Sequence, residues 1–289
     1  MGSRKKIILG NRIIGDGCSV FIIAEAGVAH FGDFEVAKKQ IDAAVEAGCD
    51  AVKFQKRDVD SIKDKYWKNR LSFKEFSESE MIELKKYCDN KKISFFVTAH
   101  DKKSLDFVNN VLDVPFLKIG SGESLDDEFV AKVGACKKPV FVSFGLHLNI
   151  EEIKKTIKIL EKNGATDIIP MYCSTVYPTP PNIIDMNQIN IMRDEFNYPV
   201  GYSDHVQGSH FILTSIAKGV NVVEKHISLD KNDLRSLDCV VSCEPPELKL
   251  MVSQIRDIDV SKNKYDHKKR IKEILEARKW VGKMINKNL

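Results

Sequence analysis

The sequence lacks any segment that could anchor the chain in a membrane. Its longest apolar run, residues 20–29, is interrupted by Glu25 and is far shorter than the ~20 residues that a membrane-spanning helix needs. Residues 1–6 carry positive charge, but no apolar region of a secretory signal follows them. The seven cysteines include no Cys-x-x-Cys pair, so neither a zinc ribbon nor a disulfide framework is indicated. We expect a cytoplasmic protein without a membrane partner.

The chain also has little net charge. Lys and Arg number 45 against 41 Asp and Glu, which leaves +4 spread along 289 residues. A nucleic-acid-binding domain usually carries a basic arm or stripe. None is present here, so we expect no nucleic-acid partner. Hydrophobic residues make up 43% of the chain, which excludes disorder as a description of the whole protein.

Short apolar runs alternate with amphipathic helical segments along the chain. The runs are rich in Val, Ile and Phe, as parallel strands buried on both faces are. They cover residues 20–24, 51–54, 94–97, 115–119, 140–143, 167–171, 198–202 and 222–225. Eight strand–helix units in a chain of this length favour a (β/α)₈ TIM barrel. No early Gly-x-Gly-x-x-Gly indicates a Rossmann sheet instead.

Three segments fall outside the barrel pattern. Residues 7–14 place two apolar dyads around Gly10-Asn11, which predicts a hairpin that caps the N-terminal end of the barrel. Residues 56–77 form a long polar loop of the kind that covers a functional site, and a Lys-rich helix is expected over residues 266–286. We expect a single TIM-barrel domain over residues 1–289, with the hairpin in 1–17, the barrel in 18–257 and a C-terminal helical extension in 258–289.

Polar or charged residues follow every predicted strand. Because the carboxyl ends of barrel strands meet at one mouth, we expect these side chains to line one pocket. Burying so many charges without a ligand would be costly. The residues are Glu25, Lys53, Gln55, Thr98, Lys118, Ser121, Glu123, Ser143, Ser174, Thr175, Tyr177, Ser203, Asp204, His205, Glu224, Lys225 and His226.

The chemistry of this set indicates an anion site beside a cation site. The basic and hydroxyl side chains, with backbone amides freed by neighbouring glycines, suit an anion that carries phosphate and carboxylate; they are Lys53, Lys118, Ser121 and Ser143. His205 and His226 follow neighbouring strands and could place two imidazole nitrogens on one divalent cation. Carboxylates for proton transfer or for orienting other groups are supplied by Glu25, Glu123, Asp204 and Asp238.

Taken one at a time, such residues also have structural interpretations. A single histidine near a strand end is usually a hydrogen-bonded structural residue, and His30, His100 and His147 stay open in this respect. Cys173 follows a strand without an evident activating base, so we interpret it as a core residue rather than a nucleophile.

Six short segments, each at a predicted strand end, form a recognisable series. They are residues 21–33 (FIIAEAGVAHFGD), 51–55 (AVKFQ), 117–123 (LKIGSGE), 177–180 (YPTP), 201–205 (GYSDH) and 223–230 (VEKHISLD). In this order the chain resembles the sialic acid synthase family, the phosphoenolpyruvate-dependent synthases of nine-carbon keto-sugar acids. The resemblance runs over about residues 15–257.

The resemblance implies a barrel that condenses phosphoenolpyruvate with the open-chain aldehyde of an N-acylated hexosamine, using Mn²⁺ or Mg²⁺. It implies that His205 and His226 ligate the metal. The residues that it places around phosphoenolpyruvate are Lys53, Lys118, Ser121, Ser143, Thr175 and Ser203. Those that it places at the sugar, the water or the reacting groups are Glu25, Glu123, Tyr177 and Asp238, with Glu25 or Asp238 as the base that activates water.

The chain departs from the family pattern mainly on the sugar side. Relatives commonly have Asn-His at Ala29-His30 and Gly-Pro-Asp-His where residues 236–239 read Ser-Leu-Asp-Cys. They often have Asn at Thr175 and Ser-Thr-Gly-Met where residues 143–146 read Ser-Phe-Gly-Leu. We expect the chain to lack the family's C-terminal antifreeze-like domain, which in relatives contributes an arginine to a partner's active site. We expect the phosphoenolpyruvate and metal half to match the family and the sugar half to differ.

Two alternatives stay open. One is a related phosphoenolpyruvate–sugar synthase, such as those that make deoxyoctulosonate or deoxyheptulosonate phosphate; such enzymes need extra basic residues for a phosphorylated sugar, and no second basic cluster is evident in the sequence. The other is a non-catalytic barrel that needs a separate chain to supply the missing domain. Relatives dimerise partly by exchanging that domain, so a homodimer is an expectation here.

Overall fold

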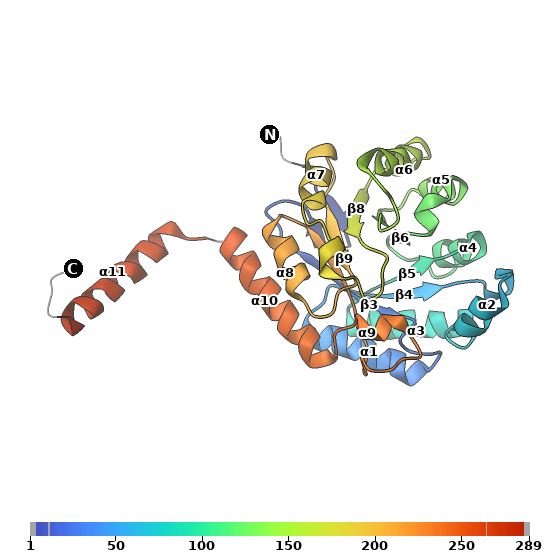
Figure 1. Ribbon diagram of the computed structural model, residues 1–289, viewed down its shortest axis with the longest axis horizontal. Coiled ribbons are helices and arrows are strands. Elements are labelled where there is room, and N and C mark those ends of the chain that lie inside the picture. Colours follow the sequence, from blue (N-terminus) through green and yellow to red (C-terminus); the bar gives the residue numbers. More distant parts are fainter. Residues whose placement is uncertain (1–3, 11, 264, 286–289) are drawn as a thin grey trace.

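Eight parallel strands close into a barrel in the order β10-β3-β4-β5-β6-β7-β8-β9 (Figure 1). The structure is a computed structural model that describes residues 4–10, 12–263 and 265–285. The barrel strands are β3 (Phe21–Gly27), β4 (Ala51–Lys56), β5 (Ser94–Ala99), β6 (Leu117–Ile119), β7 (Val140–Ser143), β8 (Ile168–Cys173), β9 (Gly201–Asp204) and β10 (Val222–His226). The predicted TIM barrel is confirmed.

Helices surround the barrel and connect its strands (Figure 1). They are α1 (Phe34–Ala47), α3 (Glu78–Lys91), α4 (Lys102–Asn110), α5 (Asp127–Ala135), α6 (Ile150–Lys162), α7 (Gln188–Glu195), α8 (His210–Ala217) and α10 (Pro245–Asn263). Shorter helical pieces lie in the loops: η1 (Val59–Ser61), α2 (Lys65–Ser72), η2 (Glu123–Leu125), η3 (Pro181–Ile183) and α9 (Leu237–Val240). Among the described residues, every helix is too short or too polar to cross a membrane.

Local sequence signals set the helix boundaries. Helix α1 begins after Asp33, whose carboxylate accepts hydrogen bonds from the backbone amides of Glu35 and Val36. It ends at Gly48, which takes the left-handed conformation with φ 83° that glycine adopts without steric cost. Helix α3 begins with a reciprocal capping box between Ser77 and Glu80.

Four phenylalanine rings fill the barrel near the starts of its strands. Phe116 packs against Phe96 and Phe141, with ring centroids 4.7 and 5.4 Å apart, and Phe21 lies 6.2 Å from Phe141. All four side chains are buried. This aromatic cluster closes the N-terminal half of the barrel, so polar side chains can gather only at the carboxyl ends of the strands.

A hairpin lies at the N-terminal end of the barrel, as predicted. Strands β1 (Ile7–Leu9) and β2 (Arg12–Ile14) pair antiparallel, with Ile7 opposite Ile14. Lys5 holds the hairpin to the barrel through an ion pair of 2.8 Å with Asp167, the residue before β8. Of the predicted turn residues, Asn11 lies outside the described residues.

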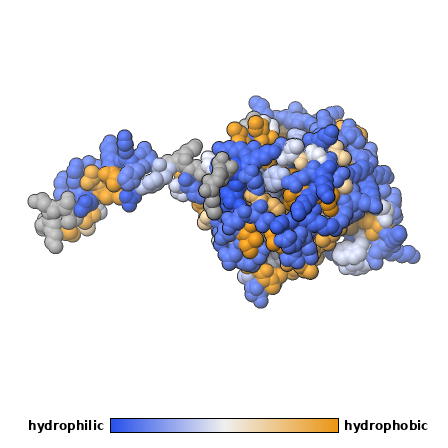
Figure 2. All heavy atoms as spheres, turned by 90° about the horizontal axis from the view of Figure 1, so that it is seen from above, coloured by the Kyte–Doolittle hydropathy of each residue, from blue (hydrophilic) through white to orange (hydrophobic). Residues whose placement is uncertain are grey.

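The C-terminal part contains two helices. Helix α10 packs against α1 and α8 and continues to Asn263, beyond the boundary at residue 257 expected from the sequence. Helix α11 (His267–Met284) extends away from the barrel (Figure 1), and Figure 2 shows apolar patches on it beside polar ones. The last residue of the helix expected from the sequence, Asn286, lies outside the described residues.

Candidate active site

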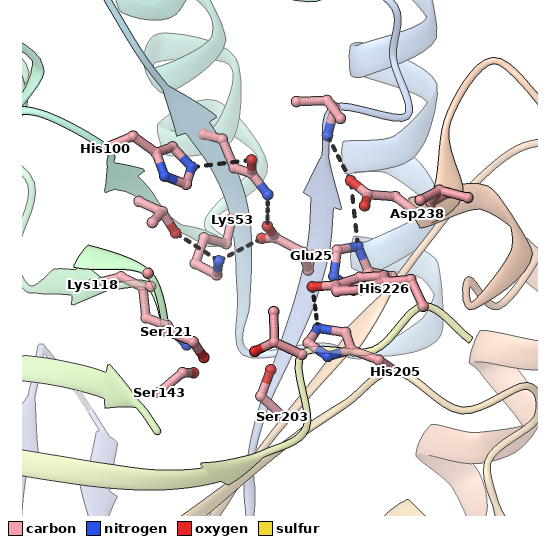
Figure 3. A pocket seen from close by; sticks show the side chains of 18 of the residues that line it. Glu25, Lys53, His100, Lys118, Ser121, Ser143, Ser203, His205, His226 and Asp238 are labelled. Carbon is pink, nitrogen blue, oxygen red and sulfur yellow. Dashed lines mark hydrogen bonds and ion pairs between the residues drawn. The ribbon is translucent and has the colours of Figure 1, made fainter. Parts of the chain in front are cut away.

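A cavity of about 330 Å³ lies at the carboxyl ends of the barrel strands (Figure 3). Side chains from different strands and loops point into this common space (Figure 3). The residues that the family resemblance implies at phosphoenolpyruvate, the metal or the reacting groups line it: Glu25, Lys53, Lys118, Ser121, Glu123, Ser143, Thr175, Tyr177, Ser203, His205, His226 and Asp238. Of the larger set expected at the strand ends, Ser174, Asp204 and Lys225 do not line the cavity.

Two lysines and two glutamates form the floor of the cavity. Glu224 Oε2 lies 3.0 Å from Lys118 Nζ and 3.7 Å from Lys53 Nζ, and Lys53 also pairs with Glu25 at 2.8 Å. Burial acts to raise the pKa of Glu224, but Lys118 and Lys53 outweigh it and hold that pKa well below its usual range. Burial raises the pKa of Glu25 to about 7, against the opposing effect of Lys53. The floor thus holds two ammonium groups beside one firmly ionised carboxylate.

Hydroxyl groups without partners lie beside this floor. The buried Ser143 Oγ and Thr175 Oγ1 accept and donate no hydrogen bond, although buried polar groups are normally satisfied. They lie near Gly145, whose amide donates to Ser121 Oγ at 3.0 Å. A Cβ atom at Gly145 would overlap Thr175 Oγ1 and lie 2.9 Å from Ser121 Oγ. This part of the cavity is built to take hydrogen bonds from a bound group.

The two predicted metal-binding histidines face each other across the cavity, with ring centroids 5.2 Å apart. Burial lowers the pKa of His205 to about 4 and that of His226 to about 3, so both imidazoles are neutral near pH 7. His205 Nδ1 donates to the carbonyl of Ser174 at 2.6 Å, and its Nε2 accepts a hydrogen bond of 2.8 Å from the hydroxyl of Tyr177. The buried His226 Nδ1 has no hydrogen-bond partner.

These imidazoles fit a divalent cation as its two protein ligands. Neutral imidazole is the form that binds metals, and a hydrogen bond from the other ring nitrogen fixes the tautomer. Within the described ranges, no group of three or more His, Cys, Asp or Glu side chains is arranged to bind a metal ion by itself. A cation held by His205 and His226 would therefore keep open positions for water and substrate oxygens.

Asp238 reaches the cavity from α9 and lies beside the second histidine. Its Oδ2 is 3.9 Å from His226 Nδ1 and accepts a hydrogen bond of 3.4 Å from the Val28 amide. Gly27 permits this approach, because a Cβ atom there would lie 2.8 Å from Asp238 Oδ2. Gly27 also has φ 54°, a conformation that side chains rarely adopt.

A chain of hydrogen bonds joins Glu123 to Glu25 across the cavity. His100 Nδ1 lies 2.8 Å from Glu123 Oε1, and its Nε2 lies 3.1 Å from Gln55 Oε1. The amide of Gln55 then donates to Glu25 Oε1 at 2.9 Å. His100, which the sequence left open, thus belongs to the site as an orienting residue.

Other residues considered from the sequence lie elsewhere or are inert. The carboxylate of Asp204 does not reach the cavity, because it pairs with Lys225 at 2.7 Å in a fully buried ion pair. His30 does not line it either and stacks on Phe76, with ring centroids 4.2 Å apart. Cys173 lines the cavity, but burial raises the pKa of its thiol to about 11, which agrees with an unreactive cysteine.

Five residues of the long loop line the cavity although the sequence gave them no role: Arg57, Trp67, Arg70, Leu71 and Lys74. The length and polarity of residues 56–77 predicted a cover over the site. Nothing in their spacing showed which side chains point inward.

Comparisons with known proteins identify relatives of the chain. The model of the NeuB family matches residues 40–267. An N,N'-diacetyllegionaminic acid synthase of Campylobacter jejuni is 37% identical over 82% of this chain and 75% of its own length. An N-acetylneuraminate-9-phosphate synthase of Drosophila melanogaster is 33% identical over 84% of this chain and 69% of its own length.

A solved structure supports the same grouping. The crystal structure of an N-acetylneuraminic acid (sialic acid) synthetase of Leptospira borgpetersenii, in complex with citrate, has a TM-score of 0.86 and 30% identity to this chain. The match covers 96% of this chain and 97% of that one. The chain therefore belongs to the NeuB family and is an enzyme of the sialic acid synthase type.

Proposed function

We propose that the chain condenses phosphoenolpyruvate with the open-chain aldehyde of an N-acylated hexosamine-type sugar, giving a nonulosonic acid and phosphate. We propose Mn²⁺ or Mg²⁺ as its cofactor. One observation carries the proposal: buried Lys53 and Lys118 lie in the same cavity as two neutral imidazoles and unpartnered hydroxyl groups. Family membership supports it further.

The anion half of the cavity suits phosphoenolpyruvate. Lys53 and Lys118 supply positive charge, and Ser143 and Thr175 supply hydroxyl groups that have no partner within the described chain. The hydroxyl of Ser203 donates to Glu224 at 2.9 Å, so its lone pairs and position are fixed before a ligand enters. Such preorganised groups stabilise developing anionic charge without reorganisation.

The reaction forms one carbon–carbon bond and breaks one carbon–oxygen bond. C3 of the enol attacks the aldehyde carbon, and the aldehyde oxygen takes a proton to become a hydroxyl group. Water adds at C2, and the bond between C2 and the phosphate oxygen then breaks to release phosphate. A divalent cation, when bound, supplies Lewis acidity to the aldehyde oxygen.

Glu25 is our first candidate for the base that takes the proton from water. It lies on the floor 2.8 Å from Lys53, beside the groups proposed to hold phosphoenolpyruvate. The amide of Gln55 donates to Glu25 and fixes its orientation. Gln55 is in turn held by His100, which contacts Glu123. Asp238 is the second candidate, since it reaches the same cavity next to His226.

Phosphate release from phosphoenolpyruvate tests the proposal. We expect release to require both a divalent cation and an N-acyl hexosamine, and to fall at least about 100-fold in Lys118→Met. Lys154→Met is the control for the lost charge, because Lys154 lies on α6 outside the cavity and pairs with Glu195. Release that continues without an aldose, or after the cation is chelated, would contradict the proposed reaction.

Four expectations stay predictions: a homodimer, a separate chain that carries an antifreeze-like domain, a single-domain organisation and a cytoplasmic location. Light scattering of the purified chain tests the first of them.

A further inference from the structure

Three basic side chains of one loop line the cavity without any role in the proposed phosphoenolpyruvate site. Arg57 follows β4, Arg70 lies on α2, and Lys74 follows α2. The sequence suggested no second basic cluster, because these residues are 13 and 4 positions apart in a Lys-rich chain. The path of the loop brings them into one cavity, which corrects that expectation.

These cations have no carboxylate partner among the described residues. Lys74 is only 5% exposed, yet its ammonium group makes no ion pair or hydrogen bond among the described residues and lies 5.6 Å from the ring of Phe73. Arg70 lies over the ring of Tyr66 at 5.5 Å. Burial lowers the pKa of Lys74. The carboxylate of Asp238 opposes this effect, and the positive charge of Arg70 adds to it. Lys74 thus buries most of its side chain and brings an ammonium group without an anionic partner to the cavity, which points to an anionic ligand.

Phosphoenolpyruvate does not account for the positive charge of Arg57, Arg70 and Lys74, which we call the loop cluster. Its phosphate and carboxylate are matched by the lysines and hydroxyl groups on the barrel strands. Two carboxylates that line the same cavity are engaged elsewhere: Glu123 pairs with His100 at 2.8 Å, and Asp238 accepts from the Val28 amide. A second anion, carried by the other substrate, fits the remaining positive charge.

We propose that the acceptor sugar is a phosphate monoester, and that Arg57, Arg70 and Lys74 bind its phosphate. This inference rests on the proposed function and names the substrate class of the same site. Two guanidinium forks and one ammonium group offer enough donors for the three terminal oxygens of a phosphate monoester. Trp67 adds an aromatic side chain to the lining of the same cavity.

The names of the relatives do not indicate whether the acceptor of this chain is phosphorylated or neutral. One of them is named for a phosphorylated product and another for an unphosphorylated one. In the first case the phosphate at C9 of the product corresponds to C6 of the hexosamine, because phosphoenolpyruvate supplies the first three carbons. N-acetylmannosamine 6-phosphate and N-acetylmannosamine are therefore the matched pair of probes.

Calorimetry and phosphate release with both probes test the inference. In the full chain with Mn²⁺, we expect the phosphorylated sugar to bind at least about tenfold more tightly than the neutral sugar. Arg70→Gln and Lys74→Met should each reduce this preference about tenfold, while the KM for phosphoenolpyruvate stays within twofold. The control Lys68→Gln lies on the same helix but pairs with Asp60 outside the cavity, and it should keep the preference.

The outcomes separate this inference from the proposed function. Equal binding of the two sugars, or a preference that survives both substitutions, overturns phosphate recognition even if the synthase reaction occurs. A lower affinity for phosphoenolpyruvate in Arg70→Gln or Lys74→Met also overturns it, because these residues would then serve the other substrate. Preferential binding of the phosphorylated sugar without turnover supports the phosphate site and contradicts the proposed reaction.

Discussion

The carboxylate of Glu224 lies 3.0 Å from the ammonium group of Lys118 at the buried floor of the cavity. The same carboxylate lies 3.7 Å from Lys53 and accepts a hydrogen bond from Ser203. One glutamate on β10 therefore positions side chains from β4, β6 and β9. Its negative charge also allows two buried lysines to stay close together, which neither could do in an apolar barrel.

Replacing Glu224 by Gln should weaken both stability and activity. The amide keeps the shape but leaves Lys118 without its carboxylate, and removing one partner of a buried ion pair costs about 3–5 kcal/mol. Urea unfolding measures this loss, and the KM for phosphoenolpyruvate should rise at the same time. Glu247→Gln removes the partner of Lys231 at the surface and should destabilise the chain much less than Glu224→Gln, because solvent screens exposed ion pairs. Wild-type stability in Glu224→Gln would show that the ion pair between Glu224 and Lys118 does not stabilise the folded chain.

Gly145→Ala should block the anion half of the cavity while leaving the barrel folded. The added methyl group would overlap Thr175 Oγ1 and crowd Ser121 Oγ, so both hydroxyl groups must move. We expect the KM for phosphoenolpyruvate to rise at least about tenfold, the size of a lost hydrogen bond to a charged group. At Gly122 an added Cβ meets nothing within 4 Å, so Gly122→Ala should have a smaller effect. Equal effects of the two substitutions would contradict this assignment.

His205→Asn should remove metal binding but preserve the local backbone contact. The Asn amide can still donate to the carbonyl of Ser174, whereas the nitrogen that faces the cavity is lost. The affinity for Mn²⁺, measured by electron paramagnetic resonance, should fall by more than the roughly 10–100-fold typical of losing an outer hydrogen-bond partner. His147→Asn is the control, because His147 contacts Thr156 outside the cavity. Unchanged Mn²⁺ affinity in His205→Asn would exclude this imidazole as a ligand.

The free energy of unfolding should decrease as the pH falls from about 6.5 to about 4, and His30 should contribute to the decrease. Burial lowers the pKa of His30 from 6.5 to about 4, so the unfolded chain takes up a proton in this range while the folded chain does not. The full contribution, about 3 kcal/mol, is present above pH 6.5 and is lost toward pH 4. Chelated protein should be used, so that metal binding does not add to the effect.

His30→Asn should flatten this pH dependence. Asn cannot titrate here, and its side-chain oxygen can replace His30 Nδ1 as the acceptor for the Gly32 amide, which now donates at 3.1 Å. His267→Asn, on the exposed helix α11, should keep the wild-type slope. If His30→Asn and wild type lose stability in parallel, the buried neutral imidazole is not the cause.

The barrel and most of its site were predictable because strand periodicity and βα connectivity dictate them. Polar residues after parallel strands must meet at one mouth, and this brought His205 and His226 together from neighbouring strands. The same alternation could have corrected one assignment. Ser203 and His205 point inward, so Asp204 between them points outward, where it meets Lys225.

The loop cluster was not predictable from periodicity, because the path of residues 56–77 depends on tertiary contacts within the folded chain. The amide of Arg57 is held by the carboxylate of Glu75 at 3.1 Å, and the ammonium group of Lys56 by the carbonyl of Phe76 at 2.6 Å. These contacts bring the two ends of the loop together and direct Arg70 and Lys74 into the cavity. No residue spacing along the chain encodes that closure.

A crystal structure of the chain with phosphoenolpyruvate and Mn²⁺ tests the central claim most directly. We predict the phosphate and carboxylate within hydrogen-bonding distance of Lys118, Ser143 and Thr175, and the cation between the imidazoles of His205 and His226. Phosphoenolpyruvate bound outside this cavity, or a cation that contacts neither imidazole, would contradict the account.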